Sequence, residues 1–135
     1  MKVLFYASGD NDACLALERE MESLVPKRNR EVCRTIETLT LRLRRPTHNL
    51  LLALLFTATR RELTSMLSIR DLLSDLRIVL ILPDRGKKAV AKGHILRPRF
   101  LSYADSDFSD VRAVMAKMIG DAFTRARTGV GPVEG

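Results

Sequence analysis

Three short segments of the chain are almost continuously apolar, and they limit the fold more than any other feature. They run from Val3 to Ala7, from Leu50 to Thr57 and from Arg77 to Leu82. Segments of this length without polar alternation are typical of strands buried on both faces, which occur in parallel sheets covered by helices. The sequence therefore predicts an α/β protein with a parallel sheet at its centre.

Helical patterns separate these strands. An amphipathic helix is predicted over 13–25, where Cys14, Leu17 and Met21 recur at helical spacing before Pro26. The other predicted elements are helices over 36–45, 63–73, 86–93 and 111–119, and two weaker strands at 32–33 and 100–103. Such alternation of strand and helix predicts a doubly wound sheet of five parallel strands with helices on both faces.

Length and charge set further limits on the protein. The 135 residues suffice for one domain, predicted over 1–123, and the segment 124–135 contains glycine and proline without apolar periodicity, which predicts a flexible tail. The net charge of +7 favours acidic partners, while five Phe, two Tyr and no Trp offer little for stacking on single-stranded nucleic acid.

No apolar run is long enough for a signal-peptide core or a membrane span, so we expect a soluble, cytoplasmic protein without membrane association. Cys14 and Cys33 lie in apolar-patterned segments, which predicts buried, reduced thiols.

Five βα units in this order, with a short fourth helix and a polar fifth strand, resemble the receiver domains of bacterial response regulators. The resemblance covers 1–123 and lies in pattern and spacing rather than in a signature motif. It implies a flavodoxin-like fold with the strand order 2-1-3-4-5.

The residues that receivers use for phosphotransfer are missing from this chain. The resemblance implies an Asp acceptor at the end of the third strand, but no Asp or Glu lies between Thr38 and Arg61, and Leu54 or Leu55 stands at the acceptor's place. Tyr103 stands in place of the lysine that reads the phosphate on the fifth strand. The resemblance therefore implies a pseudo-receiver that is not phosphorylated, has no catalytic residue or cofactor, and acts as a protein-interaction module in bacterial signalling or regulation.

An alternative hypothesis uses the acidic residues that follow the strands. Asp10, Asp84 and Asp105 would all emerge at the carboxyl edge of the sheet, where a divalent metal could serve a phosphoesterase or nuclease. The same residues, together with Asp12, precede predicted helices, and there Asp caps free backbone N–H groups. Metal chemistry and helix capping are thus the two interpretations of these acids.

The most basic stretch of the sequence surrounds the fourth predicted helix of the five-unit pattern. Receivers contact partners through their fourth helix, fifth strand and fifth helix, so the resemblance implies a partner-binding face here. An acidic protein is the expected partner, and a homodimer or non-specific nucleic-acid contact are the alternatives. The candidate partner-binding residues are Arg85, Lys87, Lys88, Lys92, Arg97, Arg99 and Tyr103. Near the third predicted helix, Arg60 and Arg61 oppose the helix dipole, and Glu62 is the carboxylate expected to offset them.

Overall fold

The computed structural model describes residues 1–9 and 11–128, with side chains described up to 121. Its five strands form one sheet of order β2-β1-β3-β4-β5, and every neighbouring pair is parallel. The strands are β1 (Lys2–Ala7), β2 (Arg30–Cys33), β3 (Leu50–Phe56), β4 (Ile78–Leu82) and β5 (Phe100–Tyr103). This order confirms the predicted fold class, a flavodoxin-like doubly wound sheet.

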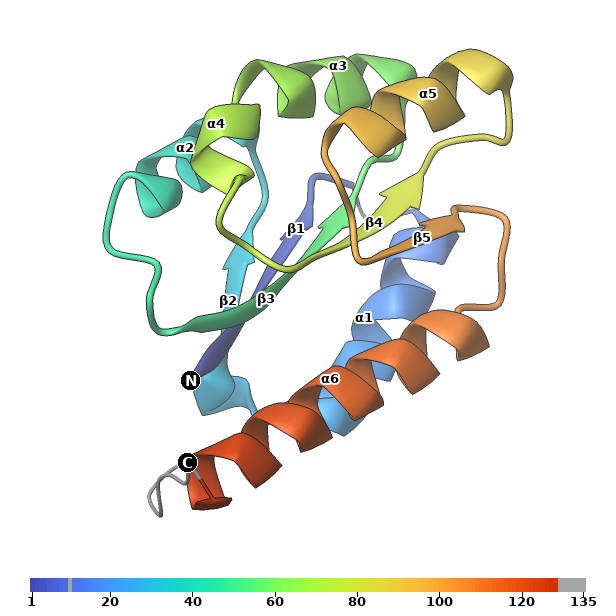
Figure 1. Cartoon of the computed structure of the whole chain (residues 1–135). Coiled ribbons are helices and arrows are strands. Elements are labelled where there is room, and N and C mark those ends of the chain that lie inside the picture. Colours follow the sequence, from blue (N-terminus) through green and yellow to red (C-terminus); the bar gives the residue numbers. More distant parts are fainter. Residues whose placement is uncertain (10, 129–135) are drawn as a thin grey trace.

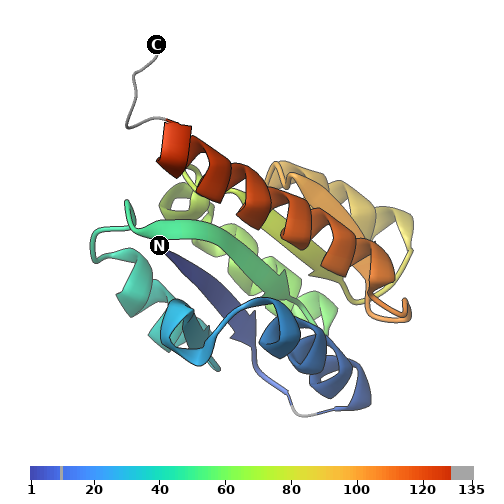
Figure 2. The ribbon, with the colours of Figure 1, turned by 90° about the horizontal axis from the view of Figure 1, so that it is seen from below.

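The helices cover both faces of the sheet (Figure 1). They are α1 (Asp12–Leu24), η1 (Lys27–Asn29), α2 (Ile36–Leu43), α3 (Arg60–Ser68), α4 (Arg70–Leu73), α5 (Lys87–Ile95) and α6 (Ser109–Thr128). Helices α1 and α6 lie side by side on one face, as Figure 2 shows from below, and α2, α3, α4 and α5 lie on the other face. Two layers of helices therefore enclose the sheet.

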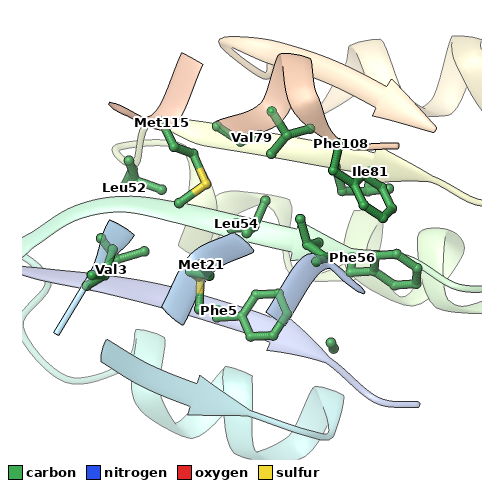
Figure 3. Close-up of a cluster of buried hydrophobic side chains, with 14 of the residues drawn as sticks. Val3, Phe5, Met21, Leu52, Leu54, Phe56, Val79, Ile81, Phe108 and Met115 are labelled. Atoms are coloured by element: carbon green, nitrogen blue, oxygen red, sulfur yellow. The ribbon is translucent and has the colours of Figure 1, made fainter. Parts of the chain in front are cut away.

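Alternation along the strands divides the core between these two faces. On the face of α1 and α6, Phe5, Leu54 and Phe56 pack with Met21 and Met115 (Figure 3). The rings of Phe56 and Phe108 meet edge to face with their centroids 6.4 Å apart. Phe100 also packs against this cluster, as a partly buried side chain at the start of β5.

The second core cluster lies under α2, α3, α4 and α5. Leu4, Tyr6 and Leu55 point to this side of the sheet, and Leu63 and Met66 of α3 cover them. Because all residues of β3 and β4 are buried, the central strands need apolar side chains on both faces, as their sequences predict.

The structure differs from the predicted elements in two places. The single helix predicted over 63–73 is divided into α3 and α4 at Ile69, whose φ of −112° and ψ of 20° depart from helical values. Just before this break, the Ser68 hydroxyl donates to the Ser65 carbonyl at 2.5 Å, so a side chain competes with the helical backbone bonds. Helix α6 extends from Ser109 to Thr128, well beyond the helix predicted over 111–119, and 129–135 of the predicted tail lie outside the described residues.

None of the helices in the described part of the chain combines the length and the apolar character needed to cross a membrane.

Candidate functional site at the carboxyl edge of the sheet

The carboxyl edge of the sheet is the place where a fold of this topology carries its chemistry. Strand β1 continues to β2 on one side while β3 lies on its other side, so the strand order reverses between β1 and β3. Ligands of open α/β sheets bind at such a reversal, in the crevice beyond the carboxyl ends of the strands. The residues that follow β1, β3, β4 and β5 therefore define the candidate site.

Beside β1 and β3, this edge is occupied by a hydrogen-bonded carboxylate from α3. The Ser8 hydroxyl donates to Glu62 Oε2 at 2.7 Å, and the Tyr6 hydroxyl donates to Glu62 Oε1 at 3.3 Å. The Ala58 amide also donates to Glu62, at 3.5 Å. Burial, followed by the nearby charge of Glu62, raises the pKa of Tyr6 to about 12. The prediction that Glu62 offsets its arginine neighbours is wrong, because the first turn of α3 directs this carboxylate to β1.

The carboxylate that pairs with Arg60 belongs to Asp84, in the loop after β4. Arg60 donates to Asp84 through Nε at 2.8 Å and through Nη2 at 3.1 Å. The Gly86 amide donates to the same carboxylate at 2.7 Å. These hydrogen bonds, the guanidinium first, hold the pKa of Asp84 below its ordinary value. A Cβ at Gly86 would lie 2.7 Å from Arg60 Nη2 and 2.8 Å from Asp84 Oδ1, so a larger residue there would shift the ends of these two side chains.

A second arginine–carboxylate pair lies at the carboxyl end of β5. Arg85 donates to Asp105 through Nη2 at 3.0 Å and through Nε at 3.2 Å, and this pair lowers the pKa of Asp105. The guanidinium carbon of Arg85 lies 4.2 Å from the centroid of the Tyr103 ring, in a cation–π contact. Tyr103, which the resemblance to receivers implies in place of a lysine, thus contacts a cation from the neighbouring loop.

A third arginine bridges the strands at the other end of the same edge. Arg34, just after β2, donates to the Ala7 carbonyl at 3.2 Å and to Glu18 Oε2 of α1 at 2.8 Å. Arginine–carboxylate pairs therefore stand at β1 and β2, at β4 and at β5. Sequence analysis missed all three pairs, because the partners are 16 to 24 residues apart and no local motif joins them.

Two of the three acids of the metal hypothesis lie in the described part of the chain, and each is paired with an arginine. Asp84 and Asp105 each bind their own arginine, and Asp10 lies outside the described residues. Among the described residues, no group of three or more His, Cys, Asp or Glu side chains is placed to hold a metal ion. His48 precedes β3 and His94 is in the last turn of α5, so both belong to the opposite, amino edge of the sheet.

Helix capping accounts for part of the polar sequence after β1. The N-cap of α1 is Asn11, whose side-chain oxygen accepts from the Cys14 amide at 2.8 Å, and Asp12 lies in the first helical turn. The cap is thus an asparagine that the sequence analysis did not single out, and Asp12 complements the helix dipole beside it.

The third strand supplies no charged group to the site. Leu54 and Leu55, at the acceptor's expected place, are fully buried within β3 and point to opposite core clusters. The strand is followed by Thr57, which is itself buried and donates from its hydroxyl to the Ile81 carbonyl at 2.6 Å. Strand β3 itself therefore adds no charged group to the edge, and the residue that follows it is hydrogen-bonded to β4.

The predicted partner-binding residues are distributed along α5 rather than gathered in one patch. Lys87 and Lys88 are exposed at the carboxyl edge, where α5 begins, and Lys92 donates to Thr64 Oγ1 of α3 at 3.0 Å. Arg97 and Arg99 are exposed at the amino edge, between the end of α5 and the start of β5. Helix α5, with nine residues, separates the two groups by about 13 Å.

The fold and the edge together define a class, the parallel α/β domains of flavodoxin-like topology. No family model matches the sequence, and a search of curated proteins found no match either.

Proposed function

We propose that this chain is a receiver-like module that does not take up phosphate and instead binds a protein partner with an acidic face, in bacterial signalling or regulation. The proposal rests on the ion pairs that the acids at the carboxyl edge of the sheet form. Its two described strand-end acids, Asp84 and Asp105, are neutralised by arginines of the same chain, Arg60 and Arg85. A metal ion held by Asp84 and Asp105 would first have to displace both guanidinium groups.

The surface charge of α5 supports the proposed partner. Lys87 and Lys88 are exposed in its first turn, which contains no acid, and neither lysine forms an ion pair with a described carboxylate. Cations at a helix N-terminus oppose the dipole and cost a few tenths of a kcal/mol, roughly, when nothing compensates them. Carboxylates of an acidic partner would provide that compensation, which is why we assign the partner contact to the exposed basic residues of α5.

Two measurements test this proposal. The first is an amide NMR titration with Mg²⁺ and then beryllofluoride, in which we expect no saturating shift at Ser8, Asp84 or Asp105. A coordinated, saturating shift of these signals would instead support a Mg²⁺-dependent phosphoesterase or nuclease.

The second measurement is a comparison of protein capture at low salt. The variant Lys87→Glu/Lys88→Glu is compared with Arg19→Glu/Lys117→Glu, which reverses two exposed charges on α1 and α6 of the opposite layer. We expect the wild type and the control to retain the same acidic proteins and the α5 variant to lose them. Glutamates in the first turn of α5 favour the helix dipole, so unfolding would not explain the loss. Equal retention by both variants contradicts the proposal.

A further inference from the structure

A hollow of about 460 Å³ lies at the amino edge of the sheet, between α4 and the end of α5. Its lining includes Leu76, Ile95 and Leu96 as apolar residues and Arg70 and Arg97 as cations, with Asp71 and Ser74 completing it. Ile95 is 51% exposed, one of few large apolar side chains so open to solvent in the described part of the chain. A hollow of this size, bordered by an exposed aliphatic side chain, has room for one side chain of a bound molecule.

The charged side chains around the hollow, two arginines against Asp71, favour acidic residues beside whatever occupies it. Arg70 and Arg97 are both exposed, and neither forms an ion pair with a described carboxylate. Arg97 has a φ of 52°, in the left-handed region that a residue other than glycine rarely adopts. Arg97 directly follows Leu96, the C-cap of α5, and a left-handed residue at this position is a common way for a helix to end.

The hollow continues the basic side of α5. Lys88, Lys92 and Ile95 follow the i, i+4, i+7 spacing and therefore lie along one side of the helix. The hydrogen bond from Lys92 to Thr64 shows that this side is next to α3, and Figure 1 shows α5 beside α3 with α4 near its end. About 10 Å separate Lys88 from Ile95 along the helix axis, which an extended peptide spans in about three residues.

We propose that this strip binds an acidic peptide segment of the partner, with one large aliphatic side chain seated in the hollow beside Ile95. Glutamate or aspartate residues about two or three positions from that side chain would then face Lys88 and Lys92. This inference rests on the proposed function and makes it specific, because it names the surface and the sequence character of the bound segment. A nucleic-acid backbone would satisfy the cations but would leave the apolar seat unused.

Two synthetic peptides of eight residues test the inference by NMR titration of the labelled chain at about 50 mM salt. One contains four glutamates followed, two positions later, by a leucine, and the other carries serine in place of the leucine. We expect the leucine peptide to bind about fivefold to tenfold more tightly, because its side chain leaves water. The amide signals of Ser74, Ile95 and Arg97 should shift with the leucine peptide alone.

Two matched variants test whether the leucine side chain of the peptide binds beside Ile95. Ile95→Ser should remove the advantage of the leucine peptide, whereas Leu41→Ser, which changes a 63% exposed leucine on α2, should leave it unchanged. Both positions are exposed, so both variants are expected to fold.

The outcomes separate this inference from the proposed function. If both peptides bind equally and only Lys87, Lys88 and Lys92 shift, no leucine side chain binds in the hollow, and this inference is wrong. The proposed contact of an acidic partner with the lysines of α5 would still hold. Binding of neither peptide overturns both. A short DNA duplex that binds more tightly than the leucine peptide at the same salt, with shifts along α5, overturns the acidic segment in favour of nucleic acid.

Discussion

Replacement of Arg42 by methionine is expected to destabilise the fold by about 2 to 3 kcal/mol at neutral pH. Arg42 is 6% exposed and binds Glu31 through Nε at 2.6 Å and Nη2 at 3.3 Å. It also donates to the Pro46 carbonyl at 3.0 Å and to Asn49 Oδ1 at 3.2 Å. These bonds join α2 to β2 and to the loop before β3, so the variant leaves several polar groups without their donor.

The magnitude follows from the burial of the partner. Removal of one member of a buried ion pair costs about 3–5 kcal/mol, chiefly because the other charge is left unpaired. Here the Glu31 side chain is 23% exposed and Lys2 Nζ lies 3.8 Å away, so water and a second cation reduce the cost. Replacing both partners, in Arg42→Met/Glu31→Leu, removes the unpaired charge and should restore all but about 1 kcal/mol.

Urea unfolding of the wild type and the two variants measures these free energies, and pH supplies an independent check. Hydrogen bonding to Arg42 holds the pKa of Glu31 below its ordinary 4.5, so the pair stabilises the wild type above this pH and the contribution is lost as pH falls through the folded-state pKa. The deficit of Arg42→Met should therefore shrink in acid. A double variant as unstable as the single one, or a deficit independent of pH, would refute the reasoning.

Three further predictions concern single positions. Gly93→Ala should destabilise the fold by about 1–3 kcal/mol, despite the better helix propensity of alanine, because its Cβ would lie 2.9 Å from a leucine side chain of β4. Thermal unfolding measures the loss, with Gly120→Ala, whose Cβ meets nothing within 4 Å, as the control. In a Tyr103→Phe background, absorbance at alkaline pH should show Tyr6 ionising only near pH 12, and stability should fall between pH 10 and 12 because the unfolded chain ionises first; ionisation of the folded chain near pH 10 would contradict this. Arg97→Gly should relieve left-handed backbone strain and stabilise the fold by up to about 1 kcal/mol, while weakening binding of the leucine peptide; a loss of stability would count against the strain.

The sheet was predictable from the sequence because its strands have only one stable environment. A run such as Leu50–Phe56, apolar at every position, must be buried on both faces, and the alternation with helices then requires parallel neighbours. The order of the strands came from the resemblance to receivers, and the structure confirms that order. The break at Ile69 was missed, because Leu72 and Leu73 continue an apolar pattern that one longer helix would also satisfy.

The contacts of the carboxyl edge were not predictable in the same way. Arg60 at a helix N-terminus indicates that a carboxylate or an anion is near, but many carboxylates in the chain could serve. The loop after β4, rather than the adjacent sequence, decides that Asp84 is the partner and that Glu62 turns to Tyr6 and Ser8. Pairing of charged side chains across loops depends on the course of the backbone, which composition and periodicity do not contain.

The positive charge of α5 is not matched by ion pairs in the described part of the chain, whereas most of the charge of α1 is. Glu18, Glu20 and Glu22 of α1 pair with Arg34, Arg112 and Arg30, while α5 carries three lysines and no acid, and the two helices lie on opposite faces of the sheet. An approaching acidic surface would exert a torque that turns α5 toward it before any contact forms. Since screening in physiological salt shortens this reach to about 8 Å, added salt should slow association much more than it speeds dissociation. The sheet thus keeps α1 and α5 on opposite faces of the domain, so that an acidic partner meets the α5 face first.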